Sequence, residues 1–300
     1  MSGSARGGDQ NRRRPALLLA GAVMAAVLVA GCQSSSYVYR WHYFTDSIFS
    51  PDSQILSGLW LTVSISVISQ LIGVALGVFG ALGKMSRVRP IRWLANFYVW
   101  IFRGTPLLVQ ISLLYFGLSS TRIWTWPDIN MLGFTIDGAL QAGIVALGLN
   151  EGAYMTEIVR AGIISVDPGQ MEAAKSLGMT SGQAMRRIVL PQAARVIIPP
   201  LGNEFNNMLK TTSLLVIISV AELYVIFSRK QSGPFAPFEF FLAAAVWYLL
   251  LTTIWSVIQS WIERRLARGA AGTPSQGPGF RRRVFGGRDV VEPSLASGGR

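Results

Sequence analysis

Long apolar segments alternate with short polar intervals along most of the chain. Three segments, residues 15–39, 53–83 and 240–262, contain no Asp, Glu, Lys or Arg. Each is longer than the roughly 20 residues that cross a bilayer as a helix. Two further segments, about 139–163 and 201–227, are apolar but carry a few charges. A soluble core has little use for such runs, so the pattern predicts membrane helices.

A sixth segment, Trp93 to Gly117, is interrupted by the sequence Arg103-Gly-Thr-Pro106. With it, the prediction is an all-α polytopic membrane protein with six transmembrane helices. Composition agrees, because only 14% of the residues are charged, against about 25% in soluble domains. The net charge of +12 lies mainly in tails and loops, as membrane topology requires, which argues against a nucleic-acid partner.

The Lys and Arg residues divide the chain into regions. They are concentrated in the two tails and in the intervals 84–92 and 164–200, so the positive-inside rule places both termini in the cytoplasm. The predicted regions are a basic N-terminal tail (1–14), a first transmembrane helix with an external segment (15–52), a transmembrane domain (53–265) with a cytoplasmic loop (164–200), and a disordered basic tail (266–300).

Cysteine and histidine chemistry is nearly absent, because Cys32 and His42 are the only residues of their kinds. We therefore expect no metal site and no catalytic residues. Val29-Ala-Gly-Cys32, after an Arg-rich start and an apolar stretch, also resembles a lipoprotein cleavage site. Cys32 is either such a site or part of a retained first helix, and the sequence leaves both open.

Polar residues inside the apolar segments are the candidates for a solute path. Charges in hydrocarbon are costly and usually face a bundle interior or an aqueous path. Interhelical hydrogen bonds and side chains reaching to the membrane surface are the alternative explanation. Arg103 is a partner for a substrate carboxylate or a stabiliser of the helix break beside it. The candidate path residues are Arg103, Glu157, Asn203, Glu204, Asn206, Asn207 and Lys210.

The interval 164–200 predicts two short helices joined by a glycine corner. Asp167-Pro168 is a strong helix start, and Gly178 is a natural C-terminal stop. Ser181 is expected to cap a second helix at about 182–190. Three prolines, Pro191, Pro199 and Pro200, are expected to break the chain before the next membrane segment.

This interval resembles the cytoplasmic EAA loop of bacterial ABC importer membrane subunits. The matching positions are Glu172, Ala173, Ala174, Gly178, Ile188, Leu190 and Pro191. Four flanking segments look like the polar amino-acid permease branch of that family: 58–62, 102–110, 152–160 and 203–213. The similarity covers roughly 53–265, which implies a five-helix importer core with an extra N-terminal helix.

The resemblance implies a multi-pass permease subunit in the bacterial cytoplasmic membrane, not an enzyme. In the family, the EAA loop docks into a separate cytoplasmic ATPase, so those seven residues are the expected ATPase-coupling set. Glu172 either pairs with a basic residue of the ATPase or caps its own helix. ATP is expected on that partner, and no cofactor on this chain, which has no phosphate-binding loop of the Gly-x-x-x-x-Gly-Lys-Ser/Thr type.

The other expected partners are a second permease subunit, identical or related, an external solute-binding protein and the lipid bilayer. The expected substrate is a polar amino acid or an opine, and the residues do not say which. The alternative function is an ion-coupled carrier or channel that acts without an ATPase. That alternative uses the same intramembrane charges but gives no reason for residues 167–191.

Overall fold

The computed structural model describes residues 37–131 and 134–267. The chain forms two compact units, Met1–Thr62 with Ala221–Tyr248, and Val63–Val220 with Leu249–Arg300. Most of the expected first helix, with Cys32, lies outside the described residues, as do the N-terminal tail and nearly all of the C-terminal tail. Predictions about those parts stay predictions.

The first unit contains α2 (Trp41–Phe49), α11 (Leu223–Lys230) and the first turns of α3 (Ser53–Lys84) and α12 (Pro237–Ala267). Its centre is the buried Glu222, which caps α11 by accepting a hydrogen bond from the Val225 amide at 3.0 Å. Tyr248 donates to the same carboxylate at 2.7 Å. Thr62 accepts from the Leu223 amide at 3.1 Å, which ties α3 to the start of α11.

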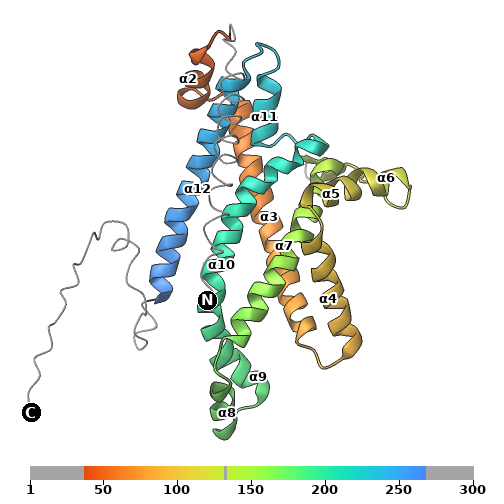
Figure 1. The fold of residues 1–300 in the computed structure, drawn as a ribbon, viewed down its shortest axis with the longest axis vertical. Helices are drawn as coiled ribbons and strands as arrows, with labels where there is room; N and C mark the ends of the chain where they lie inside the picture. Colours follow the sequence, from red (N-terminus) through yellow and green to blue (C-terminus); the bar gives the residue numbers. More distant parts are fainter. Residues whose placement is uncertain (1–36, 132–133, 268–300) are drawn as a thin grey trace, which may run out of the picture. The chain divides into compact units, whose positions relative to one another are not determined.

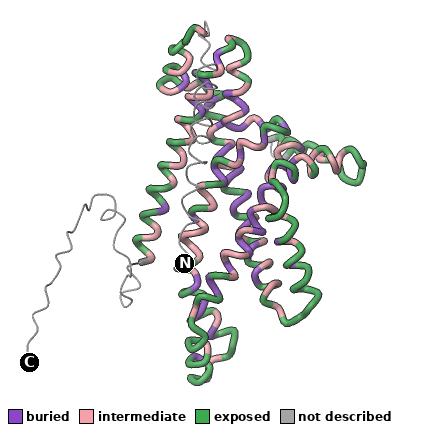
Figure 2. The backbone as a smooth tube through the Cα atoms, in the orientation of Figure 1, coloured by how far each residue is buried: buried purple, intermediate pink, exposed green. Residues whose placement is uncertain are grey.

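Helix α7 (Gly138–Ile164) is the central element of the second unit, and buried residues follow most of its length (Figure 2). It packs against α3 at small residues. A Cβ atom on Gly77 would lie 2.8 Å from the backbone carbon of Met155. Such backbone approach is what the small residues of membrane helices permit. Helix α10 (Leu190–Thr211) packs along α7 as well (Figure 1).

The interruption predicted at Arg103-Gly-Thr-Pro106 is confirmed. Helix α4 (Arg89–Gly104) ends there, and the segment Leu107–Ser120 continues at 105° to it. That segment comprises α5 (Leu107–Ser112), a π-helical turn η1 (Leu113–Gly117) and α6 (Leu118–Ser120). Gln110 supplies hydrogen bonds to backbone carbonyls at the end of α4. Its Nε2 donates to the carbonyls of Phe102 at 2.9 Å and Thr105 at 3.0 Å.

The all-α prediction misses one short hairpin. Strand β1 (Ile129–Met131) pairs antiparallel with β2 (Phe134–Ile136). Across it, Thr135 donates to Asn130 Oδ1 at 2.6 Å. Each strand alternates apolar and polar residues, Ile-Asn-Met and Phe-Thr-Ile, and period-two alternation favours strands.

The polar interval folds into α8 (Pro168–Ser176), α9 (Ser181–Ala184) and a π-helical turn η2 (Met185–Val189) that leads directly into α10. The cap of α9 is Thr180, not Ser181: Thr180 and Gln183 form a reciprocal capping box. A threonine followed three residues later by glutamine is the sequence signature of that box.

The predicted break at three prolines is wrong, because α10 runs through all of them. Pro191 lies in its first turn, where a missing N–H is tolerated. Pro199 and Pro200 lie inside the helix, where tertiary contacts hold it. Gln259 of α12 donates to the Pro199 carbonyl at 3.2 Å, and Ile197 packs against Gly162 of α7.

The predicted segment 201–227 is not one continuous helix. After α10 the chain tightens into a 3-10 helix, η3 (Thr212–Ile218), and Ser219 adopts a left-handed conformation with φ 58°. A new helix then starts at its own cap, Glu222. Among the described residues, α3 and α12 are long and apolar enough to cross a membrane alone, and two bent helix pairs raise the number to at most four. The count of six and the cytoplasmic termini therefore remain predictions.

Candidate functional site

A polar cavity of about 330 Å³ lies in the second unit, between α5, α7, α10 and η3. Helix α7 supplies three polar residues and α10 supplies three more, while leucine and methionine side chains complete the wall. A cavity with few polar groups in an apolar wall is the usual form of a small-molecule site. Its polar residues are Asn150, Glu151, Tyr154, Glu204, Asn207 and Thr211.

Glu151 is the most buried charged group of this cavity, with an exposed fraction of 5%. Its Oε1 accepts a hydrogen bond from Gln70 Nε2 of α3 at 3.0 Å. Gly73 leaves room for it, since a Cβ at that position would lie 2.7 Å from Glu151 Cβ. Helix α3 therefore holds the carboxylate in place without filling the cavity.

Asn150 links the cavity to the break between α4 and α5. Its Nδ2 donates to the Phe102 carbonyl and to Gln110 Oε1, both at 3.1 Å. At the same break, the Arg103 guanidinium carbon lies 5.0 Å from the centre of the Tyr154 ring, a cation–π distance. The predicted helix break thus places one cation beside a residue of the cavity wall.

The structure divides the predicted path residues of α10 between two places. Glu204 and Asn207 line the cavity described above. Asn206 and Lys210 line a second cavity of about 600 Å³ against α12, where Asn206 donates to Ser256 at 3.2 Å. Asn203 also faces α12 and accepts from Gln259 at 3.2 Å.

Glu157 lies apart from the cavity walls, in an ion-pair cluster. One carboxylate oxygen pairs with Lys84, the last residue of α3, and the other accepts from Arg160 Nη2 at 2.8 Å. Sequence reasoning missed Glu151, Tyr154, Gln70 and Gln110 as site residues. The adjacent pair Asn150-Glu151 in an apolar segment was the available signal for the first of these.

The loop of α8 and α9 forms the corner that its sequence predicts. Asp167 caps α8 by accepting from the Gly169 amide at 2.8 Å, so the helix cap is not Glu172. Gly178 has φ +83°, and the Met179 amide closes the helix end onto the Ala174 carbonyl at 3.1 Å. This is a Schellman ending, in which glycine supplies the left-handed residue.

The surface of this loop is mostly exposed (Figure 2). Glu172 and Ala173 are exposed, and Leu177 has an exposed fraction of 82%. Ala174 is buried within the loop, Ile188 is half-buried, and Leu190 and Pro191 are exposed at the start of α10. The α8–α9 corner therefore presents a free surface beyond the ends of α7 and α10 (Figure 1).

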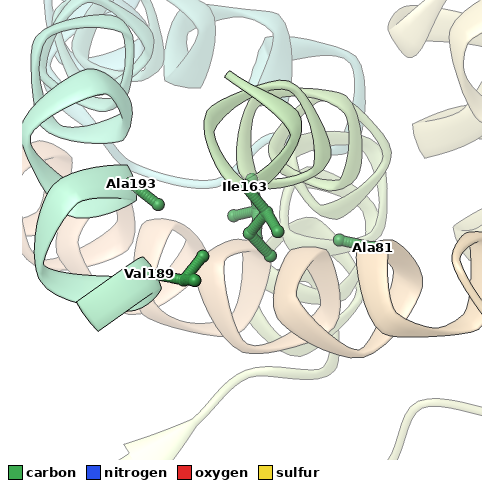
Figure 3. Close-up of a cluster of buried hydrophobic side chains, with 5 residues drawn as sticks. Ala81, Ile163, Val189 and Ala193 are labelled. Atoms are coloured by element: carbon green, nitrogen blue, oxygen red, sulfur yellow. The ribbon is translucent and has the colours of Figure 1, made fainter. Parts of the chain in front are cut away.

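A cluster of small apolar side chains joins the loop to the helices of its unit. Val189 of η2 packs with Ile163 of α7 and Ala81 of α3, together with Val159 and Ala193 (Figure 3). All five are buried. Because close-packed interiors transmit displacement, the loop is mechanically continuous with α3, α7 and α10.

Comparison with known proteins identifies the class of this protein. Residues 73–268 match the family described as binding-protein-dependent transport system inner membrane component. That match covers the cavity helices and the α8–α9 loop together. The chain belongs to this family, the membrane subunits of ABC importers.

Individual relatives are similar over most of the chain. The arginine transport system permease protein ArgU of Corynebacterium glutamicum is 39% identical over 271 residues, 87% of this chain and 83% of that protein. The L-cystine transport system permease protein TcyB of Bacillus subtilis is 40% identical over 223 residues, 72% and 88% of the two chains. A crystal structure of an amino acid ABC transporter with histidines matches with TM-score 0.67 and 39% identity, over 76% of this chain and 100% of that chain.

This protein is therefore a multi-pass permease component of an ABC importer in the inner membrane. It is a transport subunit and not an enzyme. The description of the matched family as binding-protein-dependent does not favour the alternative of a carrier or channel that acts by itself.

Proposed function

We propose that this permease carries a polar L-amino acid across the membrane through the cavity between α7 and α10. The observation that carries the proposal is the polar lining of that cavity, with Glu204 and Asn207 facing Asn150 and Glu151 across it. A zwitterion needs partners of both kinds, and amides and carboxylates with the nearby Arg103 provide them. The named substrates of the two relatives, arginine and cystine, are polar amino acids.

The α8–α9 loop is the docking element for the ATPase in this proposal. Support comes from the exposed corner at Leu177-Gly178 and from the buried cluster around Val189 that joins the loop to the bundle. Closure of the ATPases on ATP moves the loops, and the helices follow between inward-facing and outward-facing states. Glu172 is free to pair with a basic residue of the ATPase, since Asp167 caps the helix.

The complete transporter then contains a second permease subunit, two ATPase subunits and an external solute-binding protein. The test is reconstitution of the purified complex in proteoliposomes that contain ATP, with the binding protein outside. We expect ATP-dependent uptake of at least one labelled polar amino acid among arginine, glutamine and cystine. Uptake that is independent of ATP and of the binding protein would contradict the proposal.

Variants at Gly178 test the docking loop. Nothing in the described chain lies within 4 Å of a Cβ added there, so space within this chain does not restrict the position. Asparagine and aspartate tolerate the left-handed conformation better than β-branched residues such as valine, so they are suitable substitutions at this position. We expect both Gly178→Asn and Gly178→Asp to lower ATPase association, because a partner surface needs the space. Gly182→Ala, which is equally unobstructed, is the matched control. If all three variants associate with the ATPase as well as the unsubstituted protein does, docking at this corner is contradicted.

A further inference from the structure

The charges around the polar cavity are unbalanced. Glu151 and Glu204 both line it, and they lie within electrostatic range of each other. No Lys or Arg is among the residues of the described chain that form its wall. Two carboxylates facing one small volume repel each other unless a positive group lies between them.

The basic residues of the neighbouring helices form ion pairs, line another cavity or lie beside the wall of this one. Lys84 and Arg160 pair with Glu157, and Lys210 lines the other cavity, against α12. Arg103 is the cation beside the wall, over the Tyr154 ring. When all three groups are ionised, two carboxylates and one guanidinium leave one negative charge without a counter-ion.

We infer that this cavity selects amino acids whose side chain carries a second positive charge. The inference rests on the proposed function and specifies its substrate class. The α-carboxylate of such a substrate faces Arg103, and its two cationic groups face Glu151 and Glu204. A dibasic zwitterion, with net charge +1, is the ligand that neutralises the site, and unpaired charges inside a membrane protein are costly.

Other substrate classes leave the site unbalanced. A neutral amino acid supplies one cationic group and leaves one carboxylate without a partner. An acidic amino acid adds a third carboxylate to the same volume. The size agrees with a single amino acid, because about 330 Å³ is near the lower limit of ligand pockets.

The position of Glu151 is fixed before any ligand binds. Gln70 donates to one of its oxygens, and Gly73 allows the carboxylate to lie against α3. A preorganised charge contributes more to selectivity than one that must be ordered on binding. Glu151 is therefore the first residue to test.

The experiment separates the permease from the solute-binding protein, which has its own specificity. The complex of permease and ATPase is purified into lipid nanodiscs without the binding protein. Equilibrium binding of L-arginine is compared with that of L-citrulline, its neutral isostere. We expect arginine to bind at least about tenfold more tightly, as for a desolvated charge pair.

Variants then assign the selectivity to residues. Glu151→Gln and Glu204→Gln are each expected to weaken arginine binding about tenfold and to leave citrulline binding within about threefold. Glu151→Asp and Glu204→Asp keep the charge and are expected to retain a preference for arginine, which controls for folding. Asp46→Asn, the loss of an exposed carboxylate of α2 in the first unit, is the matched control and is expected to bind arginine normally.

Each result has a definite meaning. Equal or tighter binding of citrulline by the unsubstituted protein overturns the inference, as does binding of neither ligand. An arginine preference that persists in both Gln variants overturns the assignment to these carboxylates. If these results accompany ATP-dependent uptake of a neutral or acidic amino acid, the charge inference fails and the proposed function stands. Absence of ATP-dependent uptake of every polar amino acid refutes the proposed function itself.

Discussion

Glu157 of α7 pairs with Lys84, the last residue of α3, across the contact between these two helices. Its second oxygen binds Arg160 of its own helix, at 2.8 Å from Nη2 and 3.0 Å from Nε. The side chains of Glu157 and Lys84 are about four-fifths shielded from solvent. Both oxygens of the carboxylate have partners, so we expect Glu157 to hold α3 against α7 rather than to contact a substrate.

Replacing Glu157 therefore affects stability before binding. Glu157→Gln leaves Lys84 partly buried without a counter-ion, which we expect to cost about 1–3 kcal/mol. A thermal-unfolding scan of the nanodisc complex should show a lower apparent Tm, with arginine binding retained below the transition. Loss of arginine binding at an unchanged Tm would contradict this structural role and show that Glu157 acts in substrate binding.

The approach of α3 to α7 at Gly77 predicts a second sensitivity. Its Cβ would meet the backbone of Met155, which is fully buried, and a helix backbone does not yield as a flexible side chain does. Gly77→Ala should lower stability by about 1–3 kcal/mol through overpacking, although alanine is the better helix former. Thermal scans report the change. Gly182→Ala, with nothing within 4 Å of its Cβ, should be neutral or slightly stabilising, and equal losses in both variants would contradict the packing argument.

Asp52 and Lys230 predict a pH dependence in the first unit. Burial alone acts to raise the pKa of the Asp52 carboxyl, but the hydrogen bond from Lys230 and the amide of Ile55 outweigh it, so the pKa is lowered. A carboxyl whose pKa is lower in the folded state stabilises the fold above its ordinary pKa of about 4. That contribution disappears as the pH falls through the lowered value.

The effect is small, because the Asp52 side chain is 47% exposed and exposed pairs contribute less than about 1 kcal/mol. Asp52→Asn should lower the apparent Tm slightly at pH 7, and the difference should close below about pH 4. In a Lys230→Met background the same substitution should have little effect. A difference that persists at low pH, or in that background, would show that the ion pair is not its source.

Local signals in the sequence predicted local structure well. Asp167 caps α8 and Gly178 ends it, because both depend on the few residues next to them. The continuity of α10 through Pro199 depends instead on Gln259, sixty residues away. The rule that proline breaks a helix considers the local sequence only, so it does not include such a distant contact.

The site divides in the same way. The sequence predicted Glu204, Asn207, Asn203 and Asn206 alike as path residues, because it does not say which neighbouring helix each residue faces. The structure turns the first two toward α7 and the other two toward α12. Glu151 was missed because its importance comes from Gln70 on another helix, which sequence spacing does not encode.

The buried cluster around Val189 predicts where motion passes from the α8–α9 loop to the bundle (Figure 3). This prediction rests on the proposed docking of the loop. Val189→Ala removes two methyl groups among Ile163, Ala81 and their neighbours and leaves a cavity that costs about 1–3 kcal/mol. With looser packing in this cluster, the ATPase should hydrolyse ATP without moving α3, α7 and α10 through their full displacement. We expect amino acid transported per ATP hydrolysed to fall at least about twofold, while ATPase association persists.

Val196→Ala is the matched control, because it makes the same change on α10 at a side chain that is 49% exposed. It should leave transport per ATP unchanged. Val189→Ile, which keeps the β-branched shape and adds one methylene group, should retain more coupling than Val189→Ala. If Val189→Ala and Val196→Ala transport equally well per ATP, the cluster only supports the fold. The force from the ATPase must then enter the bundle elsewhere, with the continuous backbone from η2 into α10 as the remaining connection.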